Sequence, residues 1–186
     1  MMLNMMLNSI YDLNEIHDKI ESNTLELKER HTNTDKLLKS IEVFLNGNMS
    51  ECRIIIGVTA KDGRSNINDL KYIQYHITIT NKGKSKIFNN FDEYKLHLFS
   101  SLSANYPKYE EGLVDIQELC NSLGSIICIT VKQSNSRPIL HKDREMPYMR
   151  IDGANKIMSY YQYLKECSKR DEREAEKNNS YRISSC

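Results

Sequence analysis

The fold is decided by two stretches of the sequence, Glu21-Ser-Asn-Thr-Leu-Glu26-Leu-Lys28 and Cys52-Arg-Ile-Ile-Ile-Gly57-Val58. In the first, Leu25 and Leu27 alternate with polar residues, which predicts a strand with one core face and one charged face. The second is an almost unbroken apolar run closed by a glycine, typical of a central strand buried on both faces. A carboxylate and an ammonium group beside such a core allow two interpretations. They are either the solvated face of an edge strand or groups held at a cleft for chemistry.

Hydrophobic periodicity places the other elements along the chain. Apolar residues at helical spacing predict helices over residues 2–19, 35–45 and 91–105, and from residue 154 to about 177. The last helix is expected to bury Ile157, Met158, Tyr161 and Leu164. Strand patterns cover residues 52–59, 71–80, 85–88, 125–132, 137–141 and 145–151, while residues 112–119 fit either a strand or a helix.

The composition is that of one globular domain, with 186 residues, of which 39% are hydrophobic and 27% charged. We expect an amphipathic helix over residues 1–20, the domain over 21–167, and a charged, partly disordered tail over 168–186. The net charge is only +1, so any positive potential for nucleic acid has to be local.

The pattern of cysteines and the N-terminal residues together indicate the cellular location of the protein. The five cysteines are scattered, odd in number and never arranged as Cys-x-x-Cys, which argues against a zinc ribbon or a disulfide scaffold and favours a reducing environment. The apolar start lacks a basic leader and a cleavage site and is too short to span a membrane. We therefore expect a cytoplasmic protein, with a nuclear location as the alternative and no membrane partner.

Several short motifs follow one another along the chain: Glu21 to Lys28, Phe44-Leu-Asn46-Gly47, Ile54 to Val58, Asp62-Gly63, Arg137-Pro-Ile-Leu, and Pro147-Tyr-Met-Arg150-Ile followed by a helix from Ala154. In their order and spacing, over roughly residues 18–166, they resemble the Schlafen core, also called the AlbA-type (AlbA_2) nucleic-acid-binding domain. The resemblance implies an α+β fold with a mixed β-sheet flanked by helices.

The resemblance implies a metal site and an activity. In the family, the two glutamates of the first motif bind the metal of an endoribonuclease that cuts structured RNA such as tRNA. Glu21 and Glu26 match those glutamates, and Lys28 matches a lysine that would neutralise charge on the phosphate. Carboxylates suit Mg²⁺ or Mn²⁺, which lowers the pKa of a bound water. Because residues five apart in one strand point to opposite faces, the two glutamates converge only if the chain turns near Ser22-Asn23.

The sequence departs from this pattern at the third acid. Thr59-Ala60 stands where the family has acids after the Gly-Val, and the nearest carboxylate, Asp62, comes two residues late. The predicted catalytic residues are therefore Glu21, Glu26 and Lys28, with Asp62 as the third candidate metal ligand. The rival interpretations are a non-catalytic Schlafen-fold subunit of a heteromeric RNA-processing nuclease and a DNA-binding or regulatory domain.

Basic residues near these motifs are the candidates for contacts with the RNA backbone, each adding affinity that depends on salt but not on sequence. Because one copy offers half of the two-lobed clamp that such proteins form, we expect a homodimer or a heteromer with another Schlafen-like chain. The candidate RNA-binding residues are Lys28, Arg30, Lys61, Arg64, Lys82, Lys84 and Arg150.

Overall fold

The structure is a computed structural model in which residues 22–29, 31, 33–61, 64–66, 77–81, 84–121, 124–135, 138–151 and 154–183 are described. The elements are β1 (Leu25–Lys28), α2 (Thr34–Leu45), β2 (Glu51–Ile56), β3 (Thr59–Lys61), β4 (Arg64–Asn66), β5 (Ile77–Asn81), β6 (Lys84–Phe88), α3 (Phe91–Asn105), β7 (Val114–Asn121), β8 (Gly124–Lys132), β9 (Tyr148–Ile151), β10 (Ala154–Ile157) and α4 (Tyr160–Ile183).

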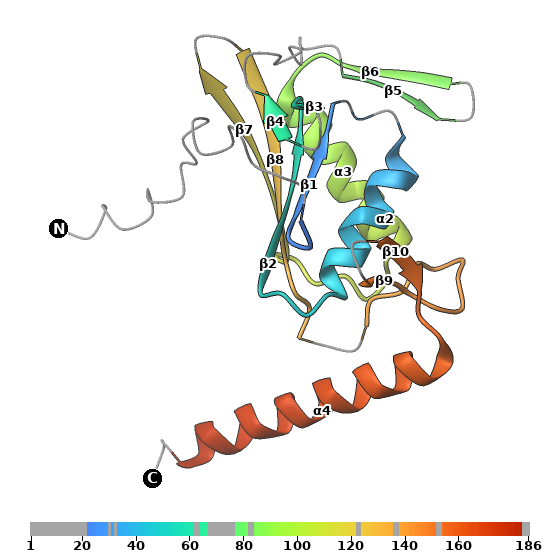
Figure 1. The fold of residues 1–186 in the computed structure, drawn as a ribbon, viewed down its shortest axis with the longest axis vertical. Coiled ribbons are helices and arrows are strands. Elements are labelled where there is room, and N and C mark those ends of the chain that lie inside the picture. The colour runs from blue at the N-terminus through green and yellow to red at the C-terminus, as the bar shows by residue number, and fades with distance from the viewer. Residues whose placement is uncertain are drawn as a thin grey trace, which may run out of the picture.

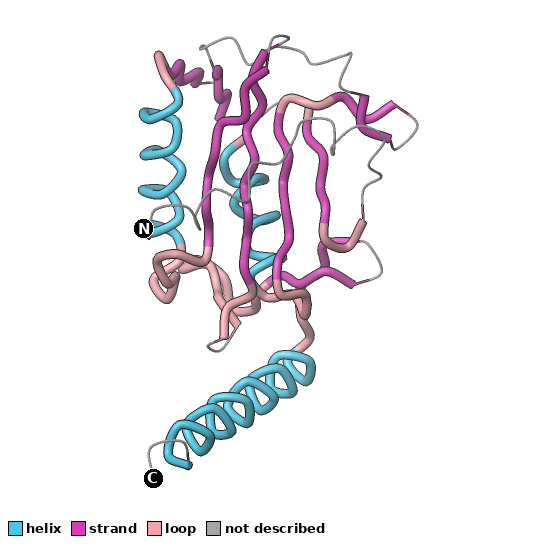
Figure 2. The backbone as a smooth tube through the Cα atoms, turned by 90° about the vertical axis from the view of Figure 1, so that its left-hand side faces the viewer, coloured by secondary structure: helices cyan, strands magenta, loops and turns pink. Residues whose placement is uncertain are grey.

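A mixed sheet in the order β1-β2-β8-β7 forms the centre of the molecule (Figure 2). β1 pairs with β2 in parallel, and the other two pairs are antiparallel. The register sets Glu26 beside Ile54. The two stretches that decide the fold are thus neighbouring strands, with β1 at the edge and β2 inside, and the mixed α+β class is confirmed.

The two faces of this sheet are covered differently. α2 and α3 lie on one side (Figure 1), where they pack with Ile54 and Ile56 in the main hydrophobic core. On the other face, Leu27 and Ile55 belong to a smaller cluster that includes Cys128. Since Leu25 also packs on that smaller cluster, alternation along β1 turns Glu26 and Lys28 towards the helices.

Both covering helices follow the sequence pattern. In α2 the predicted stripe, Leu37 to Leu45, is buried, and the helix begins where the Asn33 side chain accepts a hydrogen bond of 3.0 Å from the Lys36 backbone N–H. In α3 the residues Tyr94, Leu98 and Leu102 are buried, and Asn90 caps its first turn in the same way. The helices predicted over residues 35–45 and 91–105 are confirmed.

The C-terminal part differs from the sequence prediction. Residues 154–157 form β10, paired with β9, and the helix α4 begins only at Tyr160. Of the stripe expected to be buried only Met158 is buried, whereas Ile157 and Tyr161 are exposed. Residues 138–141, predicted as a strand, have no regular structure. Residues 154–157 form a strand and not a helix because Asp152-Gly153, a dipeptide typical of hairpin turns, separates two short stretches that pair with each other as β9 and β10.

Four further short strands form two antiparallel pairs outside the central sheet. β5 pairs with β6, as the hairpin prediction required, and β3 pairs with β4. Of residues 112–119, for which the sequence fits either a strand or a helix, those from 114 onward belong to the strand β7. The helix predicted over residues 2–19 and the first part of the strand over 71–80 lie outside the described residues. Within the described part of the chain, no helix has the length and apolar character needed to cross a membrane.

Candidate nucleic-acid interface

The Glu26 carboxylate lies where β1, α2 and β9 meet, and only 14% of its side chain is exposed. Its Oε1 atom accepts a hydrogen bond of 2.9 Å from the Ser40 hydroxyl of α2 and lies 2.5 Å from Nζ of Lys28. Its Oε2 atom lies 3.9 Å from Nη1 of Arg150, on β9. One carboxylate therefore lies between two cations.

A third cation, Lys39 of α2, contacts the strand that carries Arg150. Its Nζ is 3.8 Å from the centre of the ring of Tyr148, which is two residues before Arg150 on β9. We call Glu26, Lys28, Ser40 and Arg150 the Glu26 cluster. With two cations and one carboxylate, its formal charge is positive.

Two polar atoms of the Glu26 cluster are buried without a hydrogen-bond partner among the described residues: Oε2 of Glu26 and Nε of Arg150. The Arg150 guanidinium donates one long hydrogen bond, 3.4 Å from Nη1 to Oδ1 of Asn155. Buried polar groups are normally satisfied by protein, water or a ligand. The hydrogen bond to Asn155 therefore holds the Arg150 guanidinium, while its buried Nε–H group has no acceptor among the described residues.

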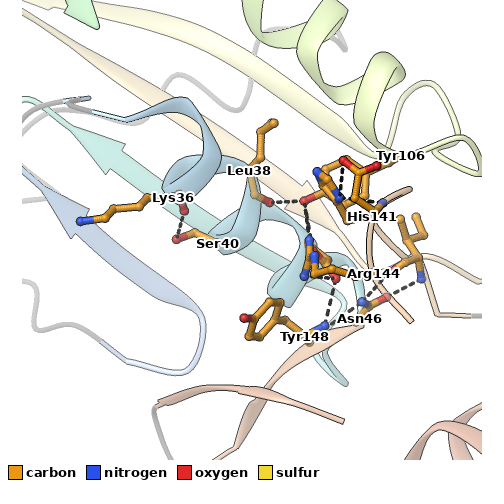
Figure 3. A network of polar contacts seen from close by, with 11 residues as sticks. Lys36, Leu38, Ser40, Asn46, Tyr106, His141, Arg144 and Tyr148 are labelled. Carbon is orange, nitrogen blue, oxygen red and sulfur yellow. Dashed lines mark hydrogen bonds and ion pairs between the residues drawn. The ribbon is translucent and has the colours of Figure 1, made fainter. Parts of the chain in front are cut away.

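A buried carboxylate on α2 fixes the segment that carries Arg150 (Figure 3). The Glu42 side chain is fully buried and accepts from both Nη atoms of Arg144, from the Tyr148 backbone N–H at 2.9 Å, and from the Tyr106 hydroxyl at 3.0 Å. Burial raises the pKa of Glu42, and the hydrogen bonds from Tyr148 and Arg144 oppose that shift. The hydrogen bonds of Glu42 therefore fix the position of Tyr148, the first residue of β9.

Asn46, at the end of α2, holds the same segment from a second side. Its amide nitrogen donates to the carbonyls of Ile139 at 2.8 Å and Tyr148 at 3.0 Å, and its Oδ1 accepts from the Ile139 N–H at 2.7 Å. The Asn46 carbonyl accepts from Arg170 of α4 at 3.2 Å, and a second Arg170 nitrogen donates to the Ser134 carbonyl at 2.9 Å. α2, β9 and α4 are thus joined through one residue.

The predicted site residues fall into three groups. The structure brings Glu26, Lys28 and Arg150 together. For a second group only the backbone is described: Lys61 and Arg64 face each other in the β3–β4 ladder, and Lys84 begins β6. The rest lie outside the described residues, namely Glu21, Arg30, Asp62 and Lys82.

The described residues do not form a metal site. No group of three or more His, Cys, Asp or Glu side chains able to hold a metal ion occurs among them. Of the three predicted ligands only Glu26 is described, and both of its oxygens face cationic groups, which oppose a divalent cation at that position. The Ser22 N–H donates to the Leu25 carbonyl at 3.0 Å just before Glu26, and the predicted convergence of Glu21 with Glu26 lies outside the described residues.

Sequence reasoning missed the residues that support the site, Glu42, Arg144 and Arg170. One signal for Glu42 was available, because it lies within the apolar stripe of α2, beside Ile41 and Leu45. A carboxylate on the buried face of a helix needs partners. Its principal partner, Arg144, lies in irregular structure with no periodicity of its own.

His31 lies just beyond β1, is 4% exposed, and places Nδ1 2.9 Å from the Tyr94 hydroxyl. Burial, chiefly, lowers its pKa to about 4, and the neighbouring His97 and Lys28 act in the same direction. The folded protein therefore holds this imidazole neutral under conditions in which the unfolded chain protonates it.

We expect this histidine to make the fold acid-sensitive. Because the pKa of His31 is lower in the folded state than the ordinary value of 6.5, the unfolded state binds the extra proton between these values. Stability should fall by about 3 kcal/mol as the pH falls from about 7 to 4. Urea unfolding of the wild type and His31→Gln at several pH values measures this. Equal pH dependence in both proteins would contradict the assignment.

A family model described as Schlafen, AlbA_2 matches residues 21–159 of the chain. No curated protein matches significantly. Among solved structures, the crystal structure of the DIP2311 protein from Corynebacterium diphtheriae is similar with a TM-score of 0.47 and 12% identity, covering 77% of this chain and 23% of that one. The solution NMR structure of the N-terminal domain of a RecG-related protein from Nitrosomonas europaea gives 0.46 and 16%, covering 76% of this chain and 88% of that one.

Proposed function

The chain belongs to the Schlafen AlbA_2 family, and from this membership we propose that it binds structured RNA, with the Glu26 cluster as the contact for a backbone phosphate. The observation that supports this proposal is the convergence of Lys28 and Arg150 on one carboxylate. The cluster carries more positive than negative charge, although the whole chain has a net charge of only +1. A local positive site is what a nearly neutral protein needs in order to hold a polyanion.

The roles of the residues follow from their positions. The Lys28 ammonium and the Arg150 guanidinium donate to phosphate oxygens, and charge-assisted hydrogen bonds of this kind are among the strongest available to a protein. Glu26 keeps the two cations close together before the RNA arrives, which limits the side-chain ordering that binding costs. Such contacts position the RNA backbone and do not read its sequence.

The test is a fluorescence anisotropy titration of a folded RNA at several salt concentrations. We expect Arg150→Ala to weaken binding by about tenfold, since a hydrogen bond to a charged group contributes roughly 1.5–3 kcal/mol, and to reduce the salt slope by about one contact. Lys108→Ala is the matched control, because Lys108 is an exposed lysine that takes no part in the Glu26 cluster. Equal loss in both variants, or tighter binding of duplex DNA than of RNA, would refute the proposal.

A metal-dependent endoribonuclease is a second proposal, supported by the turn between Ser22 and Leu25 and by the match of Glu26 to the family motif. It requires Glu21 and Asp62 to complete the ligand set with Mg²⁺ or Mn²⁺. Thr59-Ala60, in the place of acids, favours the non-catalytic alternative. In that role the chain would assemble with a second copy or with another Schlafen-like chain.

We expect the chain to bind tRNA without cutting it when Mn²⁺ or Mg²⁺ is added. The reason is that the carboxylate of Glu26 is already neutralised by Lys28 and faces Arg150. Gel analysis of the RNA beside an EDTA control and the Glu26→Ala variant gives the answer. Discrete cuts that disappear both with EDTA and in Glu26→Ala would favour the metal-dependent endoribonuclease over RNA binding without cleavage.

A further inference from the structure

Large apolar side chains are exposed where β10 leads into α4. The two tyrosines are the most exposed, at 65% for Tyr160 and 75% for Tyr161, and Ile157 and Leu164 lie on either side of them. The intervening Met158 is buried, and its N–H donates to the Pro147 carbonyl at 2.9 Å. We call Tyr160 and Tyr161 the tyrosine step. Two adjacent tyrosines on a rigid backbone, open to solvent, present aromatic surface for a ligand.

The tyrosine step is connected to the Glu26 cluster through the β9–β10 hairpin. Arg150 and Asn155 are partners in its ladder, and their side chains share a hydrogen bond of 3.4 Å. Three residues after β10 ends, the chain reaches Tyr160. α4 runs away from the body of the protein (Figure 1), but the buried side chain of Arg170 anchors it to the Asn46 carbonyl. The tyrosines therefore have a fixed position relative to Arg150.

The charge of this segment favours a polyanion. Residues 154–165 contain two lysines, Lys156 and Lys165, and no carboxylate, and both lysines are exposed. Acidic residues begin only at Glu166, beyond which the charges of α4 are mixed in sign. Exposed aromatic rings between basic side chains are the arrangement that binds single-stranded nucleic acid, in which bases stack and phosphates contact the cations.

We propose that the tyrosine step stacks unpaired bases of the same RNA whose backbone lies at the Glu26 cluster; this inference rests on the function proposed above. The ligand it selects is a structured RNA with a single-stranded segment beside its helix. The sequence of that segment matters little, because every base presents a face for stacking. Each stacked base is expected to raise affinity by about tenfold.

The experiment compares a blunt RNA hairpin with the same hairpin carrying a short unpaired tail, with 2-aminopurine in the tail to report stacking. The full chain is tested as wild type, as Tyr160→Ala with Tyr161→Ala, and with both tyrosines changed to Phe or both to Leu. Leu164→Ala is the control for apolar surface without an aromatic ring, and Arg150→Ala reports the phosphate site separately. Thermal unfolding of each variant confirms that these exposed substitutions leave the fold intact.

We expect the wild type to bind the tailed hairpin more tightly than the blunt one and to change 2-aminopurine fluorescence. The variants with both tyrosines changed to Ala or to Leu should lose the preference for the tailed hairpin and the fluorescence change, and should bind the blunt hairpin normally. The variant with both tyrosines changed to Phe, and Leu164→Ala, should keep both effects. If the Ala pair binds tailed RNA like the wild type while Arg150→Ala weakens it, only the tyrosine step is refuted. If the Leu pair behaves as wild type and Leu164→Ala does not, apolar area and not aromatic stacking carries the effect, and the inference is wrong. If the wild type binds neither hairpin, the proposed function fails with it.

Discussion

Replacement of Glu42 by alanine is expected to lower the free energy of unfolding by about 3–5 kcal/mol, because it leaves the partly buried Arg144 guanidinium without its carboxylate. The Tyr148 N–H also loses its acceptor, whereas the Tyr106 hydroxyl can still donate to the Leu38 carbonyl at 3.2 Å. A buried donor left unpaired costs about 1–3 kcal/mol by itself. The loss therefore exceeds that of an ordinary surface substitution several-fold.

Urea unfolding at neutral pH measures this effect. Glu42→Gln should lose less, because one amide oxygen can still accept, and Glu172→Ala, an exposed acid on α4, should change stability little. Replacing Glu42 and Arg144 together by methionine should recover part of the loss, since no unpaired charge remains. A double variant as unstable as the sum of the two single variants would show that the pair is not coupled.

Local patterns sufficed for the elements whose buried residues recur at one regular spacing. α2, α3, β2 and β8 bury side chains on a continuous stripe or run, so periodicity identified them from short windows. β1 was identified because its leucines alternate with charged residues. The parallel pairing of β1 with β2 is a finding of the structure, in which Glu26 faces α2 and accepts from Ser40.

Residues 154–157 were predicted as helix but form a strand, and the predicted burial of Tyr161 and Leu164 was also wrong, for one physical reason. The apolar residues at positions 157, 158, 161 and 164 match helical spacing, but a hairpin contact with β9 takes the first of them into a strand. That contact depends on partners outside the segment, which a local pattern does not contain. Most of the apolar side chains that the pattern assigned to the core are exposed instead, and one of them, Tyr161, belongs to the surface on which we propose that RNA bases stack.

The candidate site was predicted only in part. The resemblance identified Glu26, Lys28 and Arg150, and the structure brings them together. The sequence did not show that the partners of Glu26 are cations, because the second of them comes from β9, far along the chain. It also gave no sign of Arg144 and Arg170, whose partners are a buried carboxylate and backbone carbonyls respectively. Such partners are defined by tertiary packing, not by sequence spacing.

Asn46→Ala is expected to reduce both stability and RNA binding, although its side chain is fully buried and cannot touch RNA. The substitution removes three hydrogen bonds and leaves the Ile139 N–H and two carbonyls without a partner, at a cost of about 3–5 kcal/mol. Tyr148 then keeps only one of its two hydrogen bonds to α2, the one from its N–H to Glu42, and the start of β9, two residues before Arg150, is held less firmly. Arg150 should then shift from its position beside Glu26.

The functional part of this prediction is measured on folded protein, at a temperature where circular dichroism shows the variant to be native. We expect RNA affinity to fall several-fold, with a smaller salt slope than in the wild type, because one phosphate contact is lost. Cys128→Ala, a buried substitution in the smaller cluster on the opposite face of the sheet, is the matched control: it should lower stability and leave affinity unchanged. If Asn46→Ala, like Cys128→Ala, lowers stability and leaves RNA affinity unchanged, the position of Arg150 is set within the β9–β10 hairpin and not by α2.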